Sequence, residues 1–260
     1  MTAALPLTLC ISTRDAGDVL EGCLESCAGW VAEIVVVDMC SQDETRAIAE
    51  RFGARTVDAP VDRFAEPGRQ RGIEAGTQPW MLVLDADERA SDGLRRLCER
   101  TVKRDDVDGV WLCRLNHWFG RPVRHGAFWP DRKLRLFRPS RTRWPPELHT
   151  EPVVEGRIEE APADPRAAIL HFTHASVHGW LRSADVYTDV EADRLVADGA
   201  GWLRRLLIHP VGRFVEGYVA RQGFRDGALG LVVAVLSLVY ELLVAVKLWE
   251  RTHPPRAPGR

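Results

Sequence analysis

Short apolar runs alternate with amphipathic stretches over the first hundred residues of the chain. Four of these runs have the length and composition of buried strands, and they cover residues 7–12, 33–38, 54–59 and 80–85. In three further stretches the apolar residues recur at helical spacing, and these cover residues 18–29, 44–52 and 66–76. Strands and helices that alternate at such short spacing predict an α/β layer built on a mostly parallel central sheet.

The pattern changes after about residue 105. The segment 110–144 mixes aromatic and basic residues with glycines and prolines, which predicts a small irregular sheet with loops. Strand character returns at 169–174 and helical spacing at about 177–196, before a basic and aromatic stretch and an almost wholly apolar one. We therefore expect one domain over residues 1–198, with halves 1–105 and 106–198, followed by a C-terminal helical extension over residues 199–260.

Polar residues follow three of the predicted strands. They are Ser12-Thr13-Arg14-Asp15, Asp38-Met39-Cys40-Ser41 and Asp85-Ala86-Asp87. Ligands of such sheets bind at the carboxyl ends of the strands, so these three ends are expected to converge on one crevice. Burying carboxylates is costly unless a cation or hydrogen bonds offset the cost. The acidic cluster after residue 84 therefore either begins a solvated helix or holds a cation.

Asp85 and Asp87 have the spacing and the ligand chemistry of a divalent metal site. Two carboxylates one residue apart at a strand end can share Mg²⁺ or Mn²⁺, one directly and one through water or a ribose hydroxyl. Such a metal would bridge a diphosphate and act as a Lewis acid on a departing nucleoside diphosphate. Asp38 would accept hydrogen bonds from a base or a ribose, or it would simply cap its strand.

Composition and charge narrow the class of protein. The chain has 260 residues and a formal net charge of −2, which excludes a globally basic nucleic-acid binder. Residues 114–143 hold nine Lys or Arg but one acidic residue, Asp131. No nucleic-acid reader motif accompanies this charge, so no nucleic-acid partner is expected. Six cysteines without a CxxC pair and an N-terminus without a signal-peptide pattern predict reduced thiols and a cytoplasmic catalytic part.

Four blocks in a fixed order carry a resemblance to a known family. They cover residues 13–27, 33–45, 69–88 and 121–139. Together they resemble the family 2 glycosyltransferases with a GT-A fold, and most of all the branch that includes lipopolysaccharide core glucosyltransferases. The resemblance extends from Leu7 to about Glu250. It implies that the first half binds a nucleotide sugar and the second half the acceptor. It also implies a set of donor-binding residues: Thr13 and Asp15 at the first strand end, Asp38 near the base, Arg69 on the approach helix, Asp85 near the ribose and Asp87 on the metal.

Two departures from the family pattern affect the predicted site. Cys40 stands where the family usually has glycine, so a different backbone conformation is expected in that turn. Thr150 replaces the glutamate that often follows the histidine matched by His149. The general base is therefore either Glu151, which we favour, or Glu147, with His149 beside them or in a structural role. One base suffices, because family 2 members resemble inverting enzymes.

Further polar residues have both a functional and a structural interpretation. His171 and His174 would supply a late metal or phosphate ligand, or they are structural histidines. In the aromatic and basic segment 110–144, arginines would face phosphate or anionic lipid groups of an acceptor while the tryptophans pack or contact sugar faces. Those arginines are Arg124, Arg132, Arg135 and Arg138.

The C-terminal segment raises the question of a membrane. Residues 227–240 form an uncharged run of 14 residues that Glu241 interrupts. This is shorter than the roughly 18 to 20 apolar residues of a spanning helix. With basic residues on both sides, it is expected to lie in or dip into the cytoplasmic leaflet. The alternatives are a helix at a homo-oligomer interface and a spanning helix.

Together these features predict an inverting, Mg²⁺- or Mn²⁺-dependent glycosyltransferase on the inner face of the cell membrane, attached there as a peripheral or monotopic protein. It would move a sugar, with a UDP-sugar as the expected donor, to a lipid-linked glycan acceptor in cell-envelope polysaccharide synthesis. The alternatives are transfer to a polyprenyl phosphate and a non-catalytic scaffold that binds nucleotide sugars.

Overall fold

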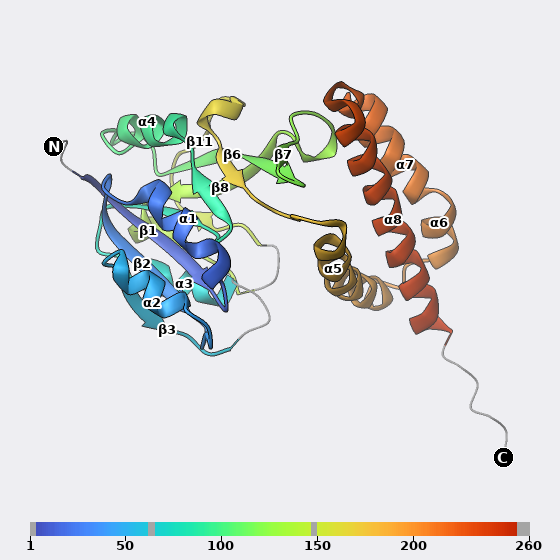
Figure 1. Cartoon of the computed structure of the whole chain (residues 1–260), viewed down its shortest axis with the longest axis horizontal. Coiled ribbons are helices and arrows are strands. Elements are labelled where there is room, and N and C mark those ends of the chain that lie inside the picture. Colours follow the sequence, from blue (N-terminus) through green and yellow to red (C-terminus); the bar gives the residue numbers. More distant parts are fainter. Residues whose placement is uncertain (1–3, 62–65, 147–149, 254–260) are drawn as a thin grey trace, which may run out of the picture. The chain divides into compact units, whose positions relative to one another are not determined.

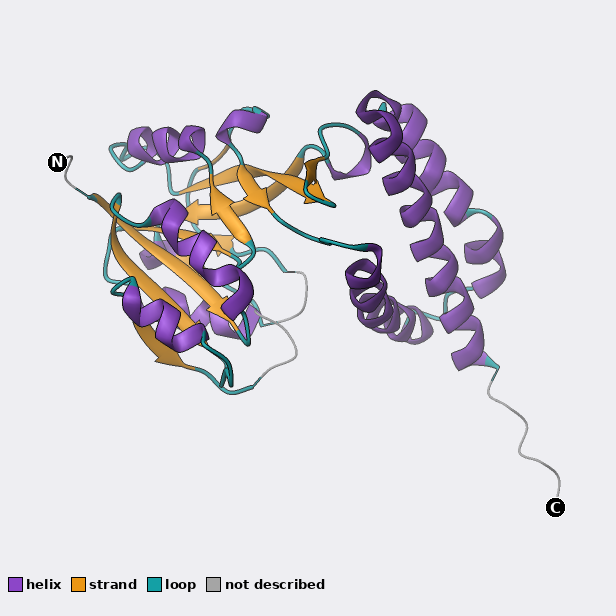
Figure 2. Ribbon diagram, in the orientation of Figure 1, coloured by secondary structure: helices purple, strands orange, loops and turns teal. Residues whose placement is uncertain are grey.

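The computed structural model describes residues 4–61, 66–146 and 150–253, and the chain forms two compact units. The first unit comprises residues 1–115 and 131–171, and the second comprises residues 116–130 and 172–260. Figure 2 shows that the first unit combines strands with helices, whereas the second is mostly helical. The predicted domain boundaries at residues 105 and 198 stay predictions.

Four parallel strands form the first half of the sheet in the first unit, in the order β3-β2-β1-β4. Their bounds are β1 (Leu5–Thr13), β2 (Val31–Asp38), β3 (Arg55–Asp58) and β4 (Trp80–Leu84). The helices that connect them are α1 (Gly17–Cys27), α2 (Thr45–Arg51) and α3 (Glu66–Ala75). All seven elements coincide with predicted ones, so the expected α/β layer with a mostly parallel sheet is confirmed (Figure 1).

Alternation along β1 separates two hydrophobic cores. Leu7, Leu9 and Ile11 pack in one core with the apolar face of α1, and Cys10 packs in the other with Ile73 of α3. This follows from strand geometry, because successive side chains point to opposite faces of a sheet. A glycine on α3 allows close contact on the second face: a Cβ atom at Gly72 would lie 2.2 Å from Sγ of Cys10. Such close packing fixes α3 against the strands, and α3 carries Arg69.

The second half of the first unit continues the sheet beyond β4 in the order β8-β6-β12-β5. β8 (Asp131–Phe137) is antiparallel to both β4 and β6 (Gly109–Trp118). The remaining elements are short: β5 (Glu88–Ala90), α4 (Asp92–Thr101), β9 (Thr142–Arg143), β10 (Val153–Val154), β11 (Ile158–Glu160), β12 (Ile169–His171) and the 3₁₀ turns η2 (Pro139–Arg141) and η3 (Pro165–Ala167). Residues 110–144 were expected to form a small irregular sheet, but their strands β6 and β8 extend the central sheet, because β8 pairs with β4.

The second unit is a set of helices with one hairpin strand, β7 (Arg121–Pro122), that pairs with the end of β6. Its helical elements are η1 (Gly126–Phe128), α5 (Val177–Ala197), α6 (Trp202–Leu207), α7 (His209–Val215), the π-helix η4 (Glu216–Ala220), η5 (Gly223–Asp226) and α8 (Gly227–Thr252). Helix α8 packs against α5, α6 and α7. Trp180 on α5 and Val233 on α8 share one of the hydrophobic clusters of this unit.

The C-terminal helix is apolar enough to associate with a membrane. Of the described residues, one helical stretch, Gly223–Thr252, has the length and composition needed to cross a bilayer. The uncharged run of residues 227–240 was expected to be too short for this, but the helix continues through Glu241 without a break and spans 26 residues. Length therefore does not separate a spanning helix from one that lies at the surface.

Candidate functional site

Asp85 follows directly after β4, on the same edge as the ends of β1 and β2. Ile11 of β1 pairs with Leu84, and Thr13 pairs with Asp38 at the end of β2. These registers bring the residues after β1, β2 and β4 to one edge of the sheet, as expected for a ligand site of a parallel α/β layer. Within β4, Met81 and Val83 face the core that contains α3. Asp85 continues this alternation toward α3.

Two buried arginines hold the Asp85 carboxylate. Nη2 of Arg69 donates to Oδ1 of Asp85 at 2.6 Å, and Nη2 of Arg135 donates to Oδ2 at 3.2 Å. Burial would raise the pKa of the Asp85 carboxyl, but the guanidinium groups of Arg135 and Arg69 outweigh it and hold the pKa well below its usual range. Both guanidinium groups also lie over the ring of Trp144, with Cζ at 4.8 Å for Arg69 and 5.4 Å for Arg135.

Arg135 reaches Asp85 from an irregular point of β8. Val110 of β6 pairs with Leu136 and Trp111 pairs with Leu134, so Arg135 has no partner on β6. Bulges of this kind redirect a side chain and are frequent next to active sites. The guanidinium group is buried, and its Nε and Nη1 have no hydrogen-bond partner in the described part of the chain. Two buried cations thus share one carboxylate, and donor groups remain for a bound anion.

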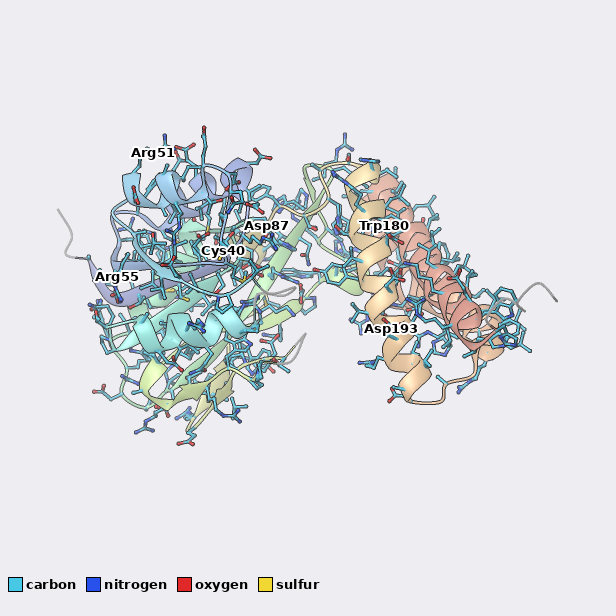
Figure 3. The ribbon with its side chains drawn as sticks, turned by 90° about the horizontal axis from the view of Figure 1, so that it is seen from below. Cys40, Arg51, Arg55, Asp87, Trp180 and Asp193 are labelled. Carbon is cyan, nitrogen blue, oxygen red and sulfur yellow. The ribbon has the colours of Figure 1, made fainter. Side chains whose placement is uncertain are left out.

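The two other carboxylates of the cluster have different partners. Oδ2 of Asp87 lies 3.3 Å from Nε2 of His171, and the Asp87 side chain is 37% exposed. Figure 3 labels Asp87, which precedes β5. Glu88 is fully buried, and its Oε2 accepts from the backbone N–H of Asp85 at 2.9 Å. Its Oε1 accepts from Arg114 at 3.1 Å. Glu88 therefore fixes the turn, and Asp87 is the carboxylate that faces water.

The loops after β1 and β2 hold each other in place. The backbone N–H of Asp15 donates to Oγ of Ser41 at 2.9 Å, and Oδ1 of Asp15 accepts from the N–H of Gln42 at 2.7 Å. Thr13 is buried at the end of β1, and its carbonyl accepts from the next loop. Asp38 is buried and accepts from Nε of Arg46 at 2.7 Å. The predicted donor-binding residues thus line one strand-end edge.

Comparison with known proteins assigns the family. A model described as "Glycosyl transferase family 2" matches residues 8–153, which is more than half of the chain. The chain belongs to glycosyl transferase family 2. The matched region includes all the strand ends described above and the arginines that contact Asp85.

Relatives of this family 2 glycosyltransferase act in the synthesis of envelope polysaccharides. The chain is 29% identical to the lipopolysaccharide core biosynthesis glycosyltransferase LpsC of Rhizobium meliloti, over 96% of this chain and 94% of LpsC. It is 35% identical to the succinoglycan biosynthesis protein ExoO of the same organism, over 41% of this chain and 34% of ExoO. A solved structure confirms the GT-A fold: mannosyltransferase PcManGT from Pyrobaculum calidifontis matches 97% of this chain and 89% of its own, with a TM-score of 0.57 and 14% identity.

Of the two candidates for the general base, the structure describes Glu151. Oε1 of Glu151 lies 3.3 Å from Nζ of Lys133, and Oε2 accepts from the backbone N–H of Leu134 at 3.2 Å. Glu151 contacts Leu134 and Asp85 contacts Arg135, so the two carboxylates contact adjacent residues of β8. Glu147 and His149 lie outside the described residues. The identity of the base stays a prediction.

Metal-ligating side chains are few at this site. In the described ranges, no group of three or more His, Cys, Asp or Glu side chains is arranged to hold a metal ion. Asp87 and His171 are two potential ligands that lie close together, with 3.3 Å between Oδ2 and Nε2. His174 belongs to the second unit, where its ring packs against Trp118 with 4.8 Å between centroids.

The structure reassigns several basic residues of the segment 110–144. Arg135, expected at an acceptor, contacts Asp85 instead. Arg132 donates to the carbonyl of Ala161, and Arg138 lies over Trp80 with Cζ 4.6 Å from the ring centroid. Arg114, which the sequence patterns did not single out, connects Glu88 to Asp131. The excess of positive charge in this segment was visible in the sequence, but the partners of each arginine were not.

The turn after β2 keeps a conformation that favours glycine. Cys40 has a φ angle of 60°, in the left-handed region. Sγ of Cys40 donates to the carbonyl of Ala59 at 3.5 Å. Cys40 thus adopts a left-handed conformation in spite of its Cβ atom, and a difference from the turn of the family stays a prediction.

Proposed function

We propose that this chain is an inverting, metal-dependent glycosyltransferase that moves a sugar from a nucleotide-sugar donor to a membrane-bound glycan or glycolipid in envelope polysaccharide synthesis. The observation that carries the proposal is the arrangement at the end of β4. There, Asp85 is held by two buried arginines, and the more exposed Asp87 lies next to it. Positive and negative groups side by side at a strand end suit a diphosphate together with its cation.

The donor diphosphate would bind near Arg69 and Arg135. Their side chains are buried, and Arg135 keeps two nitrogen atoms without partners among the described residues. Guanidinium groups bind phosphate oxygens with fixed geometry, and burial strengthens such contacts. Thr13, Asp15 and Asp38 would contact the nucleoside, since they lie at the neighbouring strand ends. A UDP-sugar is the expected donor. The PcManGT structure contains GDP-Man and Mn²⁺, which supports a nucleotide sugar in this fold.

Asp87 would be the direct ligand of Mg²⁺ or Mn²⁺. Its carboxylate is accessible, whereas both oxygens of Asp85 already accept from arginines. Asp85 would then act through water or a ribose hydroxyl, and His171 would complete the set on the protein side. Two protein ligands fit such a cation, because nucleotide phosphates and waters supply the other positions. When bound, the cation neutralises charge on the leaving diphosphate.

Glu151 would remove the proton from the acceptor hydroxyl, and Glu147 is the alternative. The carboxylate of Glu151 is held by Lys133 and the N–H of Leu134, one residue from Arg135. A base on one side of the donor sugar and a bound diphosphate on the other are what a single inverting displacement requires. His149 would lie near this base, two residues away in the chain.

The relatives and the C-terminal helix support the proposed acceptor and the proposed location. LpsC and ExoO are named for lipopolysaccharide core and succinoglycan biosynthesis, which supports a lipid-linked glycan acceptor. The apolar character of the C-terminal extension, which contains this helix, supports attachment of the extension to the inner face of the cell membrane, peripheral or monotopic. Homo-oligomerisation through this helix would be the other use of its apolar surface.

A donor screen tests the proposal. The full-length protein is heated with a panel of nucleotide sugars in the presence and absence of Mn²⁺, and stabilised pairs are then assayed for release of sugar. A bound ligand stabilises by RT ln(1 + [L]/Kd), so the donor is recognised by a metal-dependent rise in Tm. Sugar release or transfer with that donor supports the enzyme. Binding without any release, even with membrane extracts as acceptor, identifies a nucleotide-sugar-binding scaffold instead.

A further inference from the structure

The second unit carries a stripe of exposed aliphatic side chains outside α8. Its members follow one another at intervals of four residues along α6, α7 and η4: Leu203, Leu207, Val211, Val215 and Val219. Their exposed fractions range from 47% for Val215 to 64% for Leu207. Residues four apart are neighbours on a helix surface, so Leu203 and Leu207 are neighbours on α6, Val211 and Val215 are neighbours on α7, and Val219 follows on η4. Ile208 and Phe224 in the same segment are exposed as well. Exposed large apolar side chains gathered on one segment are typical of an interaction site.

Basic residues accompany this aliphatic stripe. The exposed arginines of residues 202–226 are Arg204, Arg213, Arg221 and Arg225. Two acidic residues occur in the same range. One of them, Asp226, is turned inward and accepts from the ring and the backbone of His125. The other, Glu216, pairs with Arg213 at 3.3 Å and with Arg221 at 3.0 Å, so arginines still outnumber acidic groups on this surface.

Acidic residues gather on a different helix of the same unit. Lys247 of α8 pairs with Asp185 and Asp189 of α5 at 2.7 and 3.1 Å. Arg251 of α8 pairs with Asp189 and Asp193 at 2.7 and 2.6 Å. Figure 3 shows Asp193 on α5. The acidic side chains of α5 are thus balanced by cations of α8, whereas arginines outnumber acidic residues on the segment from α6 to η5, so an anionic surface would favour that segment.

Helix α8 is itself a packed member of this unit. Val244, Ala245 and Leu248 are buried within it. Oε2 of Glu241 lies 3.3 Å from Nη2 of Arg205 on α6, as an ion pair. Insertion of α8 across a bilayer would separate these partners and expose charged groups to hydrocarbon. The ion pairs favour a helical unit that stays assembled and touches the bilayer with one face.

We propose that the stripe from α6 to η4, and not α8, is the surface by which this protein docks on a membrane rich in anionic lipids. The aliphatic side chains enter the boundary between headgroups and acyl chains, and Arg221 and Arg225 bind lipid phosphates. The bilayer is favoured over a second protein copy because a positive rim around an aliphatic strip complements anionic lipid, whereas two copies would bring the same positive rims together. The inference rests on this unit alone and does not depend on the donor chemistry proposed above.

Vesicle flotation with a matched pair of variants tests this docking surface. Val211→Asp/Val215→Asp places two charges in the stripe, and Val186→Asp/Val196→Asp places two on α5. The control valines have comparable exposure, 42% and 41%, and the change in net charge is the same. Val and Asp have similar helix propensities, so neither pair should disturb the helices. On equimolar phosphatidylglycerol and phosphatidylcholine we expect the stripe variant to partition at least about tenfold less than wild type, and the control to float normally.

A second pair of variants tests the contribution of the arginines to membrane binding. Arg221→Gln/Arg225→Gln should lower binding to the anionic vesicles by about tenfold and make it less sensitive to salt. Arg182→Gln/Arg194→Gln, which changes two exposed arginines of α5, should not lower this binding.

Normal flotation of the stripe variant, particularly with resistance to alkaline carbonate extraction, would overturn the proposal in favour of α8 as the anchor. A stripe variant that floats normally but changes from oligomer to monomer would overturn it in favour of a second copy. Circular dichroism and Mn²⁺-dependent donor binding should be unchanged in every variant. A loss of flotation then reports the docking surface, whereas a loss of donor binding would concern the proposed activity.

Discussion

An aspartate lies at the end of each of two strands of the same parallel sheet, and the two carboxylates have different partners: Asp38 is buried, and the side chain of Asp85 is 26% exposed. Asp38, at the end of β2, accepts from Arg46, whose side chain is half-exposed, and from the backbone N–H of Ser41. Asp85, after β4, is held by two arginines that are themselves buried beside Trp144. The first arrangement is a local capping of a loop. The second buries the guanidinium group of Arg135 with two of its nitrogen atoms lacking a partner in the described residues, which is costly unless an anion binds there.

The largest expected effect concerns the neighbour of Asp85. Asp87→Asn keeps the shape of the side chain and removes the charge that would hold the metal. We expect sugar release or transfer to fall by about a thousandfold, or about 4 kcal/mol, because a bound cation contributes several kcal/mol of charge stabilisation. Donor affinity should lose its dependence on Mn²⁺. Asp105→Asn, at a fully exposed side chain, is the control and should behave as wild type. Unchanged Mn²⁺-dependent affinity in the Asp87 variant would show that the metal is held elsewhere.

The next effect compares the two strand ends directly. Asp85→Asn should lower the free energy of unfolding by about 3 kcal/mol, because it removes the negative charge that two buried guanidinium groups contact. Asp38→Asn should cost only about 1 kcal/mol, since Arg46 can turn toward water. Urea titrations of both variants measure the difference. Adding Arg135→Met to Asp85→Asn should recover part of the loss, because one uncompensated cation is removed. Equal costs at the two strand ends would mean that the arginines beside Asp85 are better solvated than the structure indicates.

The strand pattern explains why so much of this region was predictable. Apolar runs that end in polar residues identified β1, β2 and β4, and their parallel order places their ends together. Asp85 and Asp87 were evident because three carboxylates follow a buried run. Arg135 was assigned to an acceptor, because its role depends on an irregular pairing of β8 that local patterns do not encode. The stacking of Arg69 and Arg135 on Trp144 joins residues 75 and 9 positions apart, and no periodicity predicts such contacts.

A third prediction concerns the base that would act opposite the diphosphate. Glu151→Gln should leave donor binding unchanged and lower transfer by about a hundredfold, the usual size of a general-base contribution. The mutant retains an oxygen that can accept from Leu134, so its local structure should persist. Glu147→Gln is the paired variant. If only the Glu147 variant loses transfer, then Glu151 serves to hold β8, in keeping with its contact to Lys133, and Glu147 is the base.

The depressed pKa of Asp85 predicts a dependence of stability on pH. A carboxyl whose pKa is lower in the folded protein stabilises it above the unfolded pKa of about 3.9, and this stabilisation is lost as pH falls toward the folded value. Between about pH 5 and pH 3, wild type should lose about 1 kcal/mol more than Asp85→Asn, which has no such group to titrate. Chemical denaturation across this range tests it. Parallel curves for the two proteins would show that the charge of Asp85 does not contribute to folding, although its oxygens accept from the arginines.

The smallest expected effect concerns Cys40, in the turn after β2. Cys40 adopts a φ angle of 60°, which strains any residue with a Cβ atom. Glycine relieves the strain but loses more entropy on folding, so the two terms partly cancel. Cys40→Ala removes the contact from Sγ to the carbonyl of Ala59 and keeps the strain, whereas Cys40→Gly removes both. Both variants lack the contact of Sγ, so the difference between their stabilities reports the backbone conformation alone. We expect the glycine variant to be more stable than the alanine variant by about 0.5 kcal/mol, measured as the shift in urea midpoint. A more stable alanine variant would show that the loop leaves the left-handed conformation once the thiol is gone, and that the contact to Ala59 holds it there.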